Sequence, residues 1–190
     1  MIFDLLRAAL LYVVVPVWLV AGFADYLCHR ASRIECTSGP KESLLHVAQF
    51  AEAGLPLLAA LLLEINAGVI LLMILCLLLH QATAIWDVRY ANGTRTVSPA
   101  EQHIHGVLEM VPFLAILVVS IMYWPAVQSI IGDVPAIFAP SLKRPPLPAW
   151  YLASVLLAVV GLAVLPYAEE LLRGLRWQRQ SSRSRNPRSA

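Results

Sequence analysis

Four of the five histidines in this 190-residue chain lie four or seven positions from an acidic residue. Residues at these spacings share one face of an α-helix, so each pair can present an imidazole and a carboxylate together. One pair occurs in each of four successive segments: Asp25 with His29, Glu42 with His46, His80 with Asp87, and His105 with Glu109. Helical bundles hold two metal ions with such ligands, so we predict that these eight side chains form a dimetal centre.

The expected cofactor is therefore a pair of divalent transition-metal ions. Nitrogen and oxygen ligands suit iron, manganese or zinc better than copper(I), and iron is the metal we expect. Glu101 follows Ser98 by three residues, as in a capping box, and is therefore assigned to a helix start rather than to the metal site. His103 is turned about 200° from His105 around a helix, so it should face elsewhere.

The elements that would position these side chains are membrane-spanning helices. Hydrophobic residues make up 59% of the chain and charged residues 14%, which is too apolar for a soluble domain. A hydrocarbon core about 30 Å thick needs about 20 apolar residues per helix. Five segments satisfy this requirement: residues 5–24, 44–63, 67–86, 104–124 and 150–167. We predict an all-α integral membrane protein with five transmembrane helices in one domain, residues 1–172, the first four helices forming an antiparallel bundle.

Positive charge predicts the orientation of this domain. Eleven Lys and Arg residues lie on the side that includes the C-terminus, and three lie on the other side. Because cytoplasmic loops have the excess, we predict an outside N-terminus and a cytoplasmic C-terminus in the cell or inner membrane. The metal site would then lie at the cytoplasmic side. Residues 173–190 are basic and Ser-rich and should form a disordered tail, while residues 125–148, with seven Pro or Gly, should fold over the outer surface.

The depth of several ionisable residues also indicates a functional site. His80 lies six residues before Trp86, or about 9 Å inside the predicted interface. Glu52 and Glu109 also lie within apolar segments. Ionisable groups at such depth cost about 2.5 to 3.5 kcal/mol each and usually face the interior of a bundle. We predict Glu52 as a catalytic base, with a role as a ligand as the alternative.

This arrangement resembles, in architecture, the histidine-rich integral-membrane di-iron oxygenases, which include alkane hydroxylases and acyl desaturases and hydroxylases. Those families have HxxxH and HxxHH boxes, whereas here only His103-Ile104-His105 places two histidines close together. The resemblance implies a lipid-facing metal site.

The predicted function is a dimetal oxidoreductase that uses O₂ to hydroxylate, desaturate or otherwise oxidise a lipophilic substrate from the inner leaflet. Electrons would come from a cytoplasmic donor, because the chain has no flavin or nicotinamide motif. One alternative is a haem b electron-transfer protein with His46, His80 and His105 as axial ligands. Another is a non-enzymatic transporter of metal ions or protons. The basic tail has too few aromatic residues to indicate nucleic acid as a partner, so membrane lipids are the expected surroundings.

Overall fold

The computed structural model describes residues 1–132 and 135–185, and these residues form helices and loops without a β-strand. Five helices are long and apolar enough to cross a membrane, which confirms the all-α class and the five predicted spans. They are Ile2–Ser32, Pro40–Leu62, Ala67–Thr94, Pro99–Met122 and Ala149–Ser184. These five helices are compatible with an integral membrane protein.

Shorter elements make up the first and last spans. The order along the chain is α1 (Ile2–Ala9), η1 (Leu10–Val14), α2 (Val15–Ser32), η2 (Ile34–Cys36), α3 (Pro40–Leu62), α4 (Ala67–Thr94), α5 (Pro99–Met122), α6 (Trp124–Ile131), α7 (Ala149–Val159), η3 (Val160–Val164) and α8 (Leu165–Arg185).

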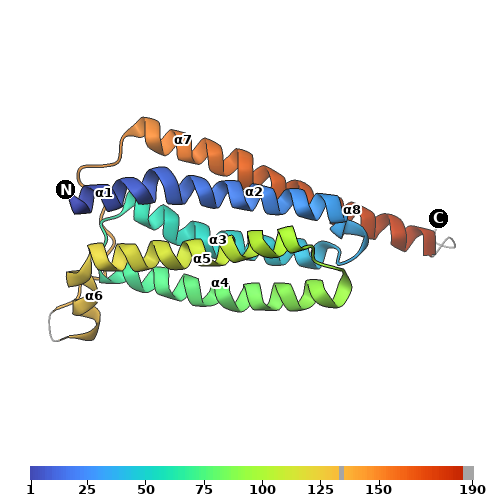
Figure 1. Cartoon of the computed structure of the whole chain (residues 1–190), viewed down its shortest axis with the longest axis horizontal. Coiled ribbons are helices and arrows are strands. Elements are labelled where there is room, and N and C mark those ends of the chain that lie inside the picture. Colours follow the sequence, from blue (N-terminus) through green and yellow to red (C-terminus); the bar gives the residue numbers. More distant parts are fainter. Residues whose placement is uncertain (133–134, 186–190) are drawn as a thin grey trace.

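Two prolines explain the π-helical segments η1 and η3. Pro16 and Pro166 each follow one of these segments by two residues. Proline lacks an N–H group and its ring clashes with the carbonyl four residues earlier, so the preceding turn widens. Figure 1 shows that both spans nevertheless continue as single rods. The last span therefore extends past Pro166 and places Tyr167 and Glu170 in its second half.

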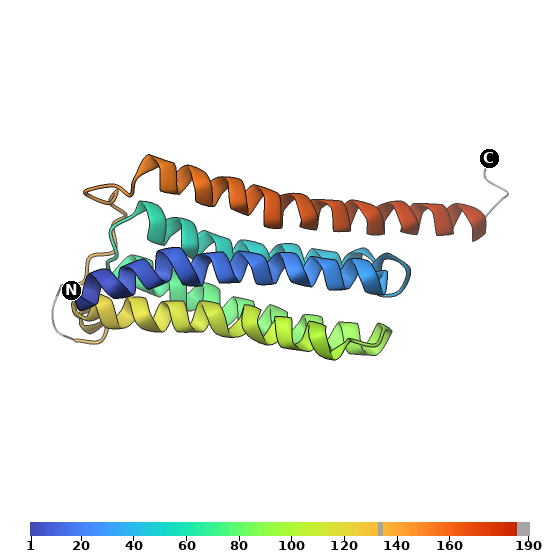
Figure 2. The ribbon, with the colours of Figure 1, turned by 45° about the horizontal axis from the view of Figure 1, so that its top comes forward.

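The five spans lie side by side, with loops at two ends (Figures 1 and 2). One end contains the N-terminus, the turn between α3 and α4, and the segment before α7; we call it the hairpin end. The other contains the loops after α2 and α4 and the end of α8; we call it the polar end. Helix α2 packs on α5 and α8, α3 packs on α4 and α8, and α4 packs on α5. The last span thus contacts the first two.

Residues 135–148, which precede α7, lie across the hairpin end, the end predicted to face outside. The Glu64 N–H group donates to the Ser141 carbonyl, and the Lys143 N–H group donates to the Leu62 carbonyl. A Cβ atom at Gly68 would lie 2.5 Å from the Phe138 carbonyl oxygen, so only glycine permits this approach. Helix α6, by contrast, was not expected in this Pro-rich segment.

The basic tail differs from its predicted disorder, because α8 is helical as far as Arg185. Arg173 forms ion pairs with Glu35 and with Glu169 on its own helix. A Cβ atom at Gly174 would lie 3.2 Å from the Pro40 backbone, so α8 also packs closely against the start of α3. These contacts stabilise a helix that apolar periodicity alone does not reveal. The predicted tail's last residues, 186–190, lie outside the described residues.

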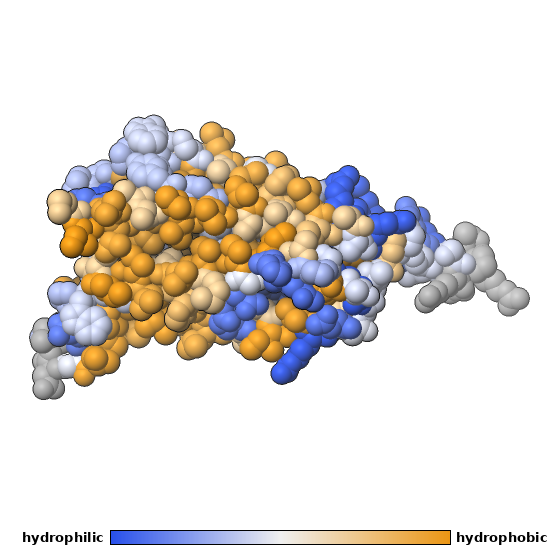
Figure 3. Space-filling view, in the orientation of Figure 1, coloured by the Kyte–Doolittle hydropathy of each residue, from blue (hydrophilic) through white to orange (hydrophobic). Residues whose placement is uncertain are grey.

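The surface separates into apolar and polar zones. Figure 3 shows hydrophobic residues over the middle of the molecule and hydrophilic residues gathered toward the polar end. Leu78 and Leu157 are among many large apolar side chains that are more than half exposed. An apolar surface of this extent indicates contact with lipid.

Candidate metal centre

Most of the buried ionisable side chains lie in the half of the molecule toward the polar end. The buried histidines and carboxylates are Asp25, His29, Glu42, His46, His80, Asp87, Glu101 and Glu170. They come from α2, α3, α4, α5 and α8. Buried charges are costly unless they are paired or coordinate a metal, so this cluster requires an explanation.

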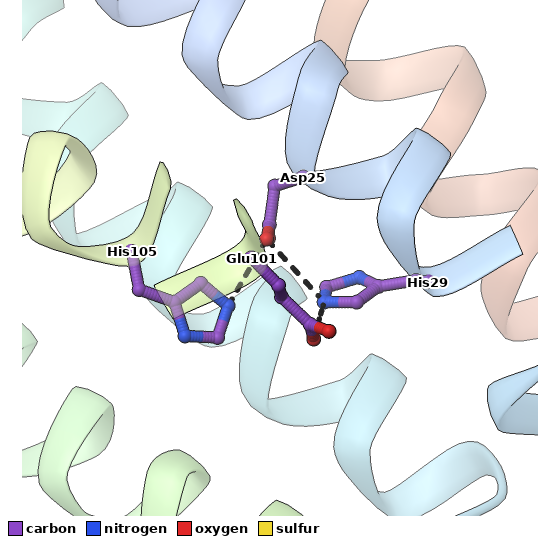
Figure 4. A group of neighbouring side chains, drawn as sticks. All are labelled: Asp25, His29, Glu101 and His105. Carbon is purple, nitrogen blue, oxygen red and sulfur yellow. Dashed lines mark ion pairs between the residues drawn. The ribbon is translucent and has the colours of Figure 1, made fainter. Parts of the chain in front are cut away.

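The first group in the cluster joins α2 and α5 (Figure 4). The Oδ1 atom of Asp25 lies 3.4 Å from His29 Nε2 and 3.0 Å from His105 Nε2. Glu101 Oε1 lies 3.3 Å from the same nitrogen of His29. One ligand atom from each of these four residues falls within 4.8 Å of the others, so the group could hold a metal ion.

Hydrogen bonds do not account for every buried polar atom of this group. Asp25 Oδ1 and His29 Nε2 are both buried, and neither has a hydrogen-bond partner among the residues that the structure describes. Ligand atoms about 2.0 to 2.2 Å from one ion lie about 3.0 to 3.5 Å apart in octahedral or tetrahedral geometry. The observed separations of 3.0 to 3.4 Å match this range.

The second group centres on His46 and Asp87. His46 Nε2 lies 3.2 Å from Asp87 Oδ2 and, within the described residues, has no hydrogen-bond partner. The side-chain amide of Gln49 donates to the same Asp87 oxygen at 3.2 Å, and Asp87 Oδ1 likewise has no partner in the described part of the chain. The imidazole rings of His46 and His29 stack with centroids 4.2 Å apart, so the two groups are adjacent.

Glu170 connects the two groups, and the sequence analysis missed it. Its Oε2 atom lies 3.1 Å from His29 Nδ1 and its Oε1 atom lies 2.8 Å from His46 Nδ1. One carboxylate therefore orients both rings with their Nε2 atoms toward other acidic residues. Metal-binding histidines commonly use the second ring nitrogen in this way. The sequence does show two adjacent acidic residues, Glu169 and Glu170, directly after the last apolar run. Neither of them has a histidine on the same helix, so the spacing rule does not select them.

Arg95 joins the carboxylates of Glu42 and Glu101. Its side chain is 3% exposed, and its Nη2 atom lies 2.5 Å from Glu42 Oε1. It also donates to both oxygens of Glu101. Burial lowers the pKa of Arg95, but the hydrogen bonds to Glu101 and Glu42 outweigh burial and raise it above its ordinary value. The cap assignment of Glu101 was therefore incomplete: Ser98 Oγ accepts its backbone N–H, while its carboxylate faces Arg95 and His29.

A separate contact forms around Glu52. Thr83 donates its hydroxyl to Glu52 Oε1 at 2.8 Å, and Glu52 Oε2 lies 3.9 Å from His80 Nδ1. Neither ring nitrogen of the buried His80 has a hydrogen-bond partner in residues 1–132 and 135–185. The expected pairing of His80 with Asp87 is replaced by this proximity to Glu52.

A cavity of about 50 Å³ joins these parts of the cluster. Its walls include the ionisable side chains Asp25, His46, His80, Asp87, His105 and Glu109. Glu109 shares the cavity with its predicted partner His105 but forms no ion pair with it. His103 is exposed and its Nδ1 lies 2.9 Å from the Pro99 carbonyl, away from the cluster.

Fold and cluster together define an all-helical protein with membrane-spanning segments and buried His/Asp/Glu groups that could hold a metal ion. Comparison with protein-family models, with curated proteins and with solved structures gives no match. The functional inference therefore depends on the geometry of the site.

Proposed function

We propose that this protein is a membrane-embedded dimetal oxidoreductase, with iron as the preferred metal, that oxidises a lipophilic substrate with O₂. The observation that supports it most is the group of Asp25, His29, Glu101 and His105, whose ligand atoms lie within 4.8 Å of one another and of which the first three are buried. In this proposal the predicted four-span bundle gains the fifth span, because α8 packs on α2 and α3 and carries Glu170, and the site lies at the cytoplasmic side of the bundle.

The excess of negative charge in the cluster also favours bound cations. The cluster contains one guanidinium, that of Arg95, and five carboxylates: Asp25, Glu42, Asp87, Glu101 and Glu170. Without a bound cation, the cluster would be neutral only if all four of its imidazoles were protonated: His29, His46, His80 and His105. An uncompensated buried charge costs several kcal/mol, whereas divalent cations would neutralise the cluster.

Five of the eight predicted ligands fit this role best. Asp25, His29 and His105, together with Glu101, would hold one ion, and His46 with Asp87 would hold the second. Glu42, which Arg95 also holds, lies within ligand distance of His29 and His46. His80 and Glu109 face the cavity that borders both groups. A cavity of about 50 Å³ has room for a few water-sized molecules, which supplies the open position that catalysis requires.

The space beside the histidines favours ions over haem b. Small-molecule and cofactor pockets usually measure about 300 to 1,000 Å³. The cavity that His46, His80 and His105 share is about 50 Å³.

The proposed reaction requires an external reductant. Hydroxylation converts one C–H bond, one O₂, two electrons and two protons into an alcohol and one water, and a cytoplasmic electron donor would supply the electrons. The metals, when bound, would supply the redox chemistry. Glu170 would hold both imidazoles in place, Arg95 would fix Glu101, and Glu52, beside His80, would accept or deliver protons at its carboxylate.

Isotope labelling tests this proposal. The metal-loaded protein is reduced chemically, mixed with an extract of its own membrane lipids and exposed to ¹⁸O₂, and the lipids are then analysed by mass spectrometry. We expect ¹⁸O in a lipid product, and Glu52→Gln should keep its metal and lower the yield. A strong Soret band, or lipids free of ¹⁸O and of new double bonds after reaction of the metal-loaded protein, would refute the proposed function.

A further inference from the structure

A second and larger cavity, of about 270 Å³, lies between the spans. Most of its wall is apolar, and the lining includes Leu11, Leu57, Leu77, Ala115 and Val119. Trp18 and His80 line both this cavity and the smaller one beside the candidate metal centre. The two spaces are therefore neighbours.

The length of this cavity suits a hydrocarbon chain. Its lining on α3 and the following turn extends from Glu52 to Glu64. Twelve residues of helix span about 18 Å at 1.5 Å per residue. One leaflet of a bilayer has a hydrocarbon depth of about 15 Å, half of the whole core. A single extended chain of ordinary lipid length would fill such a space.

Positive side chains gather at the hairpin end of this cavity. Arg7 comes from α1, and Lys143 and Arg144 come from the segment that crosses the hairpin end. Among the described residues, none of these three side chains forms an ion pair. Glu64, the acidic residue beside them, accepts the backbone N–H of Arg144 at 2.6 Å. Three cations thus face one carboxylate, which leaves a site for a further anion.

The state of Lys143 agrees with an anion-binding role. Lys143 is in the loop before α7, and burial lowers its pKa while Glu64 acts in the opposite direction. An added anion would stabilise the charged ammonium group.

We propose that this cavity binds a single-chain amphiphile with an anionic head group, held by Arg7, Lys143 and Arg144, whose chain extends toward Glu52 and His80. This substrate assignment depends on the proposed function, whereas the binding itself does not. It places the head group at the hairpin end, opposite to the inner-leaflet entry expected from the sequence. The carbon oxidised would then lie far from the head group, because Glu52 and His80 are at the other end of the cavity.

Binding measurements separate the contributions of charge and chain. Full-length protein in phosphatidylcholine nanodiscs is titrated with radiolabelled palmitate, hexadecyl phosphate or hexadecanol, with and without prior removal of metal by chelator. We expect both anions to bind at least about tenfold more tightly than the alcohol. The anion that binds more tightly identifies a carboxylate or a phosphate head group.

Variants at both ends of the protein provide the controls. Arg7→Gln combined with Lys143→Gln should weaken binding of the anions by about tenfold and leave hexadecanol unchanged. Arg89→Gln, an exposed residue at the polar end, should leave all three ligands unaffected. Ala115→Phe, inside the cavity, should weaken all three. Equal binding of palmitate and hexadecanol, or undiminished anion binding by the double variant, would overturn the assignment. Because binding is also measured without metal, failure of the metal centre would leave these results unchanged.

Discussion

Glu170 offers the most specific test of how the cluster is organised. Its carboxylate is fully buried and touches His29 Nδ1 and His46 Nδ1 at 3.1 and 2.8 Å. Glu170→Gln keeps the side-chain volume, but its amide has only one oxygen, so one of the two imidazoles loses its acceptor. Loss of such a carboxylate partner typically weakens metal affinity about 10- to 100-fold, or about 1.4 to 2.7 kcal/mol.

The neighbouring residue provides a matched control. Glu169 is 40% exposed and accepts a hydrogen bond from Tyr26, so Glu169→Gln makes the same chemical change outside the cluster. Competition with a chromophoric chelator measures metal affinity in both variants, and thermal denaturation in detergent reports their stability. We expect a weaker metal affinity only in Glu170→Gln. Equal affinities in the two variants would show that Glu170 does not orient metal-binding imidazoles.

Three further predictions concern charge, orientation and the metal. Arg95→Met removes the guanidinium that Glu42 and Glu101 share, so the free energy of unfolding in a denaturing detergent titration should fall by about 3 to 5 kcal/mol. The exposed Arg89→Met should have little effect, and equal losses in the two variants would contradict this pairing. The C-terminus should lie in the cytoplasm, so a fused reporter enzyme that works only in the cytoplasm should be active. Activity of a fused reporter that works only outside the cytoplasm would reverse the predicted orientation. Removal of metal by chelator should lower the midpoint of thermal unfolding. At a free metal concentration 100 times Kd, binding of one ion adds about 2.7 kcal/mol to the free energy of unfolding. An unchanged midpoint would count against a bound ion.

The spans could be predicted because each depends on a local run of apolar residues long enough for a bilayer. The helical spacing rule likewise selected Asp25, His29, His46, Asp87 and His105, which the structure brings into one buried cluster. It missed Glu170 because the rule considers only partners on the same helix. The histidines that contact Glu170 are 141 and 124 positions away in the chain.

Tertiary contacts also changed the interpretation of other residues. Glu101 matched a local capping pattern, yet its carboxylate faces His29 and Arg95. His80 was paired by spacing with Asp87, but Glu52 on the adjacent helix lies nearer. Such choices depend on which helices pack together, and helical periodicity contains no information about that.

The most direct test of the metal centre is metal content per protein in two variants that differ by two positions on α5. His105 lies 3.0 Å from Asp25 in the cluster, whereas His103 is exposed and contacts its own helix. Elemental analysis of gently purified protein should find about two equivalents of a first-row transition metal in the native chain and in His103→Ala, and about one in His105→Ala. Native protein without metal, or His105→Ala with its metal content intact, would contradict the proposed centre.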